Sequence, residues 1–275
     1  MEFEPHENAW QAGTGRLLTD IQLDSHFKVS VPRFIDGRDR LANSWAIAEV
    51  SPDGSSKKIS HAEWASDTSH AALRSMPRLR PSNHKGLGGI VYKKEIFDQD
   101  LNDLGITAAT VNFKISRLFA PAASAPIVFN HQGRDWHFNT EQVKQWDDII
   151  RRLTDRNMVI SGILLIDKEP SSPLLHPDYN QAGMFSIANL STREGADAYR
   201  AVVAFLAERY SRPGKTYGWV SHWIPFNEVD YGWAWTNMGE QPMAVYMDTY
   251  QKALRLSWLE ASIYNPTVEV FISLT

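Results

Sequence analysis

From residue 86 onward, two kinds of apolar pattern alternate along the chain. Short, nearly unbroken apolar runs are typical of parallel strands that are covered on both faces. Between these runs, apolar residues recur every three or four positions, as they do on one side of an amphipathic helix. The apolar runs predict five strands, at residues 88–92, 107–113, 158–166, 220–226 and 268–274.

The intervening segments predict four helices. The first runs from Lys93 to Leu104, and Gly105 follows where a left-handed cap belongs. Asn139 is placed to cap the second helix, and Ser191 with Glu194 forms a capping-box pattern before the third. The residues spaced to face the core are Val143, Trp146, Ile150 and Leu153, then Tyr199, Val203, Leu206 and Tyr210, and, in a last helix begun by Pro242, Met243, Met247, Tyr250, Leu254 and Trp258.

Strands that alternate with helices indicate an α/β fold with a parallel sheet. A hairpin is also predicted within residues 126–138, where Gly133 supplies the turn. Residues 1–85 differ, because "HFKVSVPRF" and "SWAIAEV" alternate like short strands and "SPDGSS" is rich in turn residues. The chain therefore divides into a small β-rich N-terminal region, 1–85, and an α/β part, 86–275.

Composition narrows the classes of function. The net charge of −4 and the pI near 6.1 exclude the basic face of a nucleic-acid-binding protein. No apolar run approaches the ~18 residues of a membrane span. There are no cysteines, and the nine histidines show no HExxH spacing, so we expect neither a metal site nor a cofactor. The N-terminus lacks an apolar signal core, which leaves the compartment open: inside the cell, or outside if a leader was removed.

Parallel α/β proteins place their chemistry at the carboxyl ends of the strands. Asn112, Asp167 and the pair Asn227-Glu228 occupy such positions, and the long loop after the third strand lies on the same side. A carboxylate that follows a strand is usually a solvated surface group. Glu228 stands out because it lies among indole rings, where a charge is costly. These indoles are Trp223, Trp233 and Trp235.

An Asn-Glu pair at the end of the fourth strand resembles the acid/base site of clan A, the large clan of retaining glycoside hydrolases with (β/α)8 TIM barrels. The stretch from Gly86 to Thr275 also resembles a bacterial family of glycosidase-like barrels. The resemblance implies that Glu228 is the catalytic acid/base and that Asn227 binds a sugar hydroxyl. It implies an oligo- or polysaccharide substrate, which Asn112, Asp167 and the three indoles of Trp223, Trp233 and Trp235 would contact.

In the resembled clan, the nucleophile is a Glu at the end of the seventh strand. The sequence stops after the fifth predicted strand, so we expect only about the first five strands of the barrel, a fragment or interrupted product that is inactive alone. We also expect the apolar edge strand at residues 268–274 to favour self-association.

Two other functions remain open. A non-catalytic glycan-binding or scaffold barrel would keep the aromatic cleft without turning substrate over. A barrel enzyme of another chemistry, such as a lyase or isomerase, would use Asp167 or Glu169 together with a metal.

Overall fold

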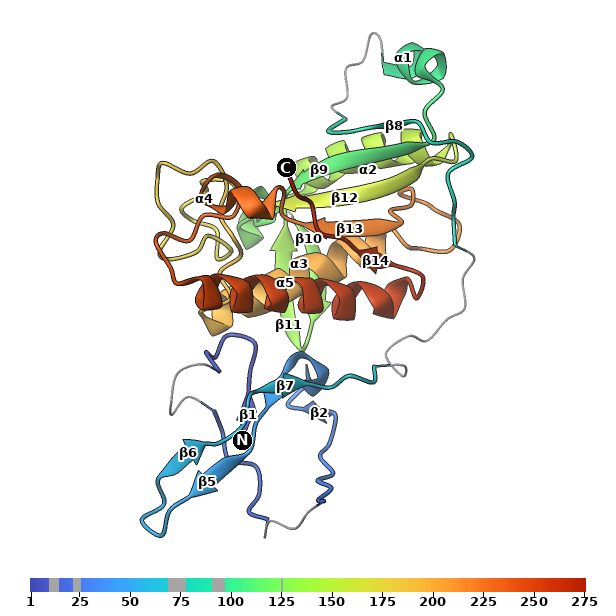
Figure 1. The fold of residues 1–275 in the computed structure, drawn as a ribbon. Coiled ribbons are helices and arrows are strands. Elements are labelled where there is room, and N and C mark those ends of the chain that lie inside the picture. Colours follow the sequence, from blue (N-terminus) through green and yellow to red (C-terminus); the bar gives the residue numbers. More distant parts are fainter. Residues whose placement is uncertain (10–14, 22–25, 69–77, 91–96, 125) are drawn as a thin grey trace.

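A computed structural model describes residues 1–9, 15–21, 26–68, 78–90, 97–124 and 126–275 (Figure 1). Its centre is a five-stranded parallel sheet with the strand order β14-β13-β12-β9-β8, so that neighbours in the chain are neighbours in the sheet. The predicted parallel α/β sheet is confirmed, and within the described residues it is open rather than closed into a barrel. The strands are β8 (Gly86–Leu87), β9 (Ala108–Lys114), β12 (Val159–Leu165), β13 (His222–Pro225) and β14 (Glu269–Val270).

The first predicted strand, at 88–92, lies partly outside the described residues, and β8 pairs with β9 just before it. The last strand is shorter than predicted, because only Glu269 and Val270 pair with β13. The predicted hairpin is present as β10 (Ile127–His131) and β11 (Arg134–Phe138). Gln132 and Gly133 both have positive φ at its turn, as tight hairpins require.

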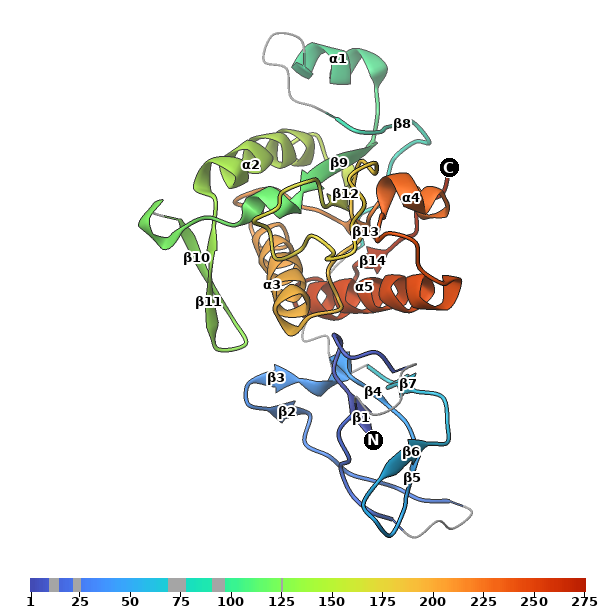
Figure 2. The same ribbon diagram turned by 90° about the vertical axis from the view of Figure 1, so that its left-hand side faces the viewer.

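Three long helices pack around one side of the sheet (Figures 1 and 2). They are α2 (Thr140–Thr154), α3 (Arg193–Arg209) and α5 (Met243–Tyr264), and α1 (Phe97–Leu104) and α4 (Gly232–Trp235) are shorter. Four 3₁₀ turns complete the elements used below: η1 (Arg40–Ala42), η3 (Ile115–Leu118), η4 (Ala122–Ser124) and η5 (Val229–Tyr231).

Most helix boundaries follow the predicted caps. Asn139 accepts hydrogen bonds from the first turn of α2, and Gly105, with φ of 59°, ends α1. The first four residues of the helix predicted from Lys93 lie outside the described residues. The capping box at Ser191 is wrong by one residue, because Thr192 accepts the bond from the Gly195 N–H while Ser191 bonds to Asn189.

The core lies between the sheet and these helices. Phe113 of β9 contacts the rings of Trp146, Tyr210 and Trp223, with centroids 4.9, 5.8 and 5.4 Å away. Gly162 of β12 leaves the space that the Trp223 ring fills. Each buried ring of this kind contributes about 1.5–3 kcal/mol relative to exposure. The inward positions predicted for α2 and α3 are buried, as expected from their spacing.

The prediction for the start of α5 is wrong. Met243 is 73% exposed and Met247 is 40% exposed, although both share the helix face of the buried Tyr250. Full burial in this helix begins at Thr249, and in the turns before it only part of the surface is covered, as at Val245 and Tyr246. Periodicity predicts which face of a helix is apolar, but not over what length other parts of the fold cover that face.

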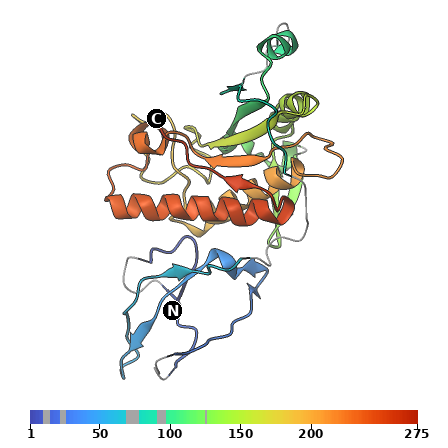
Figure 3. The ribbon, with the colours of Figure 1, turned by 45° about the vertical axis from the view of Figure 1, so that its right-hand side comes forward.

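The described part of the N-terminal region contains short strands of two or three residues. A three-stranded sheet joins β1 (Glu2–Phe3), β4 (Ser44–Trp45) and β7 (Glu63–Trp64), and two small ribbons pair β2 (Phe34–Ile35) with β3 (Arg38–Asp39) and β5 (Ala48–Val50) with β6 (Ser56–Lys58). This region lies against α5 (Figure 3).

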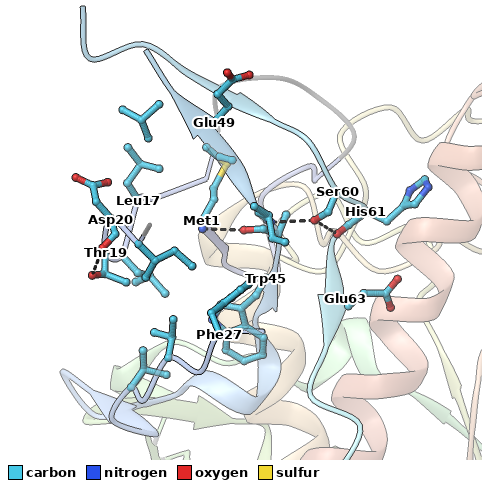
Figure 4. A pocket seen from close by; sticks show the side chains of 18 residues that line it. Met1, Leu17, Thr19, Asp20, Phe27, Trp45, Glu49, Ser60, His61 and Glu63 are labelled. Atoms are coloured by element: carbon cyan, nitrogen blue, oxygen red, sulfur yellow. Dashed lines mark hydrogen bonds between the residues drawn. The ribbon is translucent and has the colours of Figure 1, made fainter. Parts of the chain in front are cut away.

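The strand predicted within "HFKVSVPRF" does not form over residues 26–33. Instead, Phe27, Val29 and Val31 line a mainly apolar cavity of about 1160 Å³ together with Leu17 and Trp45 (Figure 4). Their alternation places them on one side of the segment without requiring a partner strand, which explains why the pattern was misleading.

Polar contacts join the N-terminal region to the helices. Arg38 forms a two-pronged ion pair with Asp197 of α3, at 2.8 and 2.7 Å. Arg255 of α5 donates to the carbonyl oxygens of Leu41 and Ala65. The division at residue 85 stays a prediction.

Candidate functional site

The candidate site begins where β13 ends. Phe226 and Glu228 both have positive φ, 66° and 41°, although neither is glycine. For a bulky residue such as Phe226 this backbone conformation is an outlier that the surrounding structure must hold in place. Its ring is fully buried, 6.2 Å from the ring of Tyr250. The buried ring therefore fixes the turn that presents Asn227 and Glu228.

Residues after β14 run beside this turn. Ser273 Oγ donates to Asn227 Oδ1 at 3.0 Å and accepts from the Glu228 N–H at 3.4 Å, and the Val229 N–H donates to the Ser273 carbonyl at 3.1 Å. These bonds use the backbone of Glu228 and one oxygen of Asn227. The half-buried carboxylate of Glu228 has no hydrogen bond or ion pair with the described residues.

Asp230, two residues further on, differs from Glu228. Both of its oxygens accept hydrogen bonds from Thr275, one from the backbone N–H at 3.0 Å and one from the hydroxyl at 2.6 Å. The Thr275 hydroxyl and backbone bonds lower the pKa of the Asp230 carboxyl. Both oxygens of Asp230 are therefore engaged, whereas the carboxyl group of Glu228 makes no such bond with the described residues.

Two aromatic rings follow on the surface. Tyr231 and Trp233 contact each other edge to face, with centroids 5.0 Å apart, and the Trp233 side chain is 60% exposed. Trp235 is half-buried and stacks on Phe185, with centroids 5.1 Å apart and an angle of 4°. Trp233 is therefore open to a ligand, while one face of Trp235 is already covered.

Trp223 is not part of this surface. It is 1% exposed and points to the helix side of the sheet, against Phe113 and over Gly162. We correct the expected substrate contact for this residue accordingly. Neighbouring strand residues point to opposite faces, so His222 takes the other side, 3.8 Å from Glu269.

The long loop between β12 and α3 packs on the segment that carries the aromatic rings. The N–H groups of Met184 and Phe185 donate to the Ala234 carbonyl, at 3.0 and 2.9 Å. Asn237 joins the two loops, since its Oδ1 accepts from the Asn180 N–H at 2.7 Å and its Nδ2 donates to the Trp233 carbonyl at 2.7 Å. No sequence signal identified Asn237, because its partner in the other loop, Asn180, lies 57 residues away in the chain.

Two other predicted site residues have bonding or pairing partners that Glu228 does not share. Asp167 is buried and bonded to Ser116, and Arg117 forms an ion pair with it at 2.6 Å, so it ties the loop to η3. Asn112 is exposed on the sheet face opposite Phe113, in register with Ile163 of β12. Asn112 faces the open side of the sheet, and its contact with a substrate stays a prediction.

No group of three His, Asp or Glu side chains in the described ranges could hold a metal ion. None of the helices in this part of the chain is both long and apolar enough to cross a bilayer.

The fold and the site define a parallel α/β protein with candidate chemistry at the carboxyl ends of its strands. Residues 77–275 match a family of unknown function, DUF5722, and the chain belongs to that family. A comparison with curated proteins gives no match.

Several solved structures are distantly similar. The β-glucosidase of Pyrococcus furiosus matches with a TM-score of 0.40 and 15% identity, over 66% of this chain and 43% of its own. Thermotoga maritima Cel5A in complex with cellobiose matches with a TM-score of 0.40 and 12% identity, over 68% and 50%. The β-glycosidase of Thermosphaera aggregans matches with a TM-score of 0.40 and 14% identity, over 66% and 42%. The chain spans half or less of the length of these three structures.

Proposed function

We propose that this chain forms part of a carbohydrate-active protein that cleaves glycosidic bonds, with Glu228 as the general acid/base. The carboxyl group of Glu228 carries the proposal: it is half-buried at the end of the fourth strand, on a turn fixed by Phe226, and has no partner among the described residues. Two nearby carboxylates differ in this respect, since Asp230 is bonded to Thr275 and Asp167 is paired with Arg117.

A glycosidic oxygen leaves only when it is protonated, so the acid must be positioned on the substrate and free to exchange its proton. Asn227 supports this role. Its Oδ1 is held by Ser273, which orients the amide and leaves Nδ2 without a partner in the described part of the chain. Nδ2 would donate to the sugar hydroxyl next to the reacting carbon.

The exposed ring of Trp233, held edge to face by Tyr231, would bind the apolar face of a sugar. Trp235 would support that surface from below through its stack on Phe185. A retaining mechanism also needs a second carboxylate about 5–5.5 Å from the acid. We assign no nucleophile among the described residues, and the neighbouring Asp230 is engaged by Thr275.

The test is a Glu228→Gln substitution in the full-length protein, which keeps the shape of the side chain and removes its proton. We expect hydrolysis of unactivated oligosaccharides to fall about 10²–10⁴-fold. Aryl glycosides with acidic leaving groups should lose much less, because they need no protonation. The matched control is Asp230→Asn, which removes a neighbouring carboxylate and should retain activity. An unchanged rate for Glu228→Gln would refute the assignment.

A second candidate function is glycan binding without turnover, and the exposed Tyr231–Trp233 pair favours it. Titration calorimetry against a panel of oligosaccharides, run beside a hydrolysis assay, separates the two. Binding that is lost in Trp233→Ala but produces no hydrolysis in the unmodified protein would support the binding function. Hydrolysis that depends on Glu228 would support the enzyme.

A further inference from the structure

A second pocket, of about 240 Å³, is lined by residues of the N-terminal region and of α3, and Glu228 is not among them. Its lining is rich in arginine. The arginines are Arg16, Arg38, Arg40, Arg193 and Arg200, and Asn43 lines the pocket beside them. Three of the arginines come from the N-terminal region and two from α3, so the pocket exists only where the two parts meet.

Carboxylates outside the pocket hold the guanidinium groups in place. Glu2 is bonded to Arg40 at 2.6 Å and to Arg16 at 2.7 Å. On the other side, Arg200 donates to Glu260 at 2.6 Å. A guanidinium has five N–H donors in a planar fork, so each pairing leaves further donors on the same group.

Arg40 shows that the donors exceed the acceptors here. It is 4% exposed, and its Nε and Nη1 atoms are bonded to Glu2 and to the Pro32 carbonyl. Its Nη2 atom is buried without a hydrogen-bond partner in the described part of the chain, whereas the oxygens of Glu2 are bonded. A buried donor without an acceptor is costly, and a ligand oxygen would relieve that cost.

Two carboxylates, of Glu4 and Asp36, also line the pocket. Glu4 is 2.8 Å from Arg193, the first residue of α3. The positive charges of the five arginines are balanced by the carboxylates that line the pocket or pair with the arginines from outside it. Directed hydrogen bonds rather than net charge would therefore select the ligand. Carboxylate oxygens accept bonds from hydroxyl groups, of which a sugar ester carries several, inorganic phosphate one or two and sulfate none.

We propose that this pocket binds a small phosphate or sulfate ester that also carries hydroxyl groups. The planar guanidinium groups bind the oxyanion, because their paired N–H donors match its oxygens. The first turn of α3 adds a partial positive charge on the same side. Glu4 and Asp36 accept from the hydroxyls. Such a ligand bridges Arg16 and Arg40 of the N-terminal region to Arg193 of α3, and so stabilises their contact.

The experiment is titration calorimetry with the complete chain at fixed ionic strength, with glucose 6-phosphate, inorganic phosphate, sulfate and glucose as probes. We expect glucose 6-phosphate to bind more tightly than phosphate or sulfate, and glucose not to bind. Glucose that binds as well as its phosphate would overturn the oxyanion part of the proposal. Inorganic phosphate that binds as tightly as the ester would overturn the hydroxyl part.

Two variants locate the site. Arg16→Gln and Arg193→Gln change side chains that are 60% and 51% exposed, so the fold should be kept, which the unliganded melting temperature checks. Each should weaken binding of glucose 6-phosphate about tenfold, the effect of one charged hydrogen bond. The matched control is Arg212→Gln. Arg212 lies just past the C-terminal end of α3 and is paired with Glu208. Equal weakening by all three, or no weakening by either pocket variant, would refute the site.

Discussion

Asn237 joins the long loop after β12 to the segment that carries Trp233. It is 6% exposed, and its amide makes three hydrogen bonds: to the Asn180 N–H at 2.7 Å, the Gly239 N–H at 3.1 Å and the Trp233 carbonyl at 2.7 Å. An Asn237→Ala change leaves all three backbone groups without their partner. Each such group costs about 1–3 kcal/mol where water cannot replace the bond. Water reaches part of this region, so we expect a total loss of about 2–4 kcal/mol.

The control for this prediction is Asn237→Asp. It keeps an acceptor for the two N–H groups and loses only the donor to Trp233, so it should cost about 1–2 kcal/mol. Urea unfolding measures both losses. Amide exchange should also become faster in the loop around residues 176–187 and near residue 233. A loss below about 0.5 kcal/mol for Asn237→Ala would show that the two loops do not depend on this amide.

Two further predictions concern the core and pH. Gly162→Ala should destabilise the protein by about 1–3 kcal/mol, because a methyl group there would lie 2.5–3.0 Å from the rings of Trp223 and Phe113. The control is Gly88→Ala, whose methyl group would meet only Thr110, at 3.6 Å. Equal urea midpoints for the two variants would refute the argument. Burial lowers the pKa of His176 below 6.5, although Asp178 opposes the shift. The unfolded chain therefore binds this proton more readily, so stability is fully present above about pH 6.5 and falls as pH decreases below it. The urea midpoint should drop between pH 7.5 and 5.5, and His176→Gln should reduce that drop.

The strands and helices of the α/β part could be predicted because their apolar residues repeat with two distinct periods. Strand 158–166 and the helix after Asn139 are clear examples, and both lie within a few residues of the expected bounds. The N-terminal region was harder, since alternation at Phe27, Val29 and Val31 fits a strand and the lining of a cavity equally well. The pattern records which side of a segment is apolar, and not what covers that side.

The position of Glu228 could be anticipated from the rule that parallel sheets place polar residues at the carboxyl ends of their strands. The contacts around it could not. Asn237 meets Asn180 across 57 residues, and Ser273 meets Asn227 across 46, and nothing in the local pattern indicates either pairing. The bonds from Thr275 that engage the carboxylate of Asp230 likewise span 45 residues.

One ambiguity, namely which of His222 and Trp223 points to the helices, changed the expected site. Alternation requires that one points to the helices and the other to the open face, but it does not say which. Gly162, the neighbour of Trp223 in register, has no side chain, and the indole of Trp223 fills the space that this leaves on the helix side. With Trp223 in the core, Trp233 is the indole left open beyond the turn, and the choice between hydrolysis and binding depends on that ring together with Glu228.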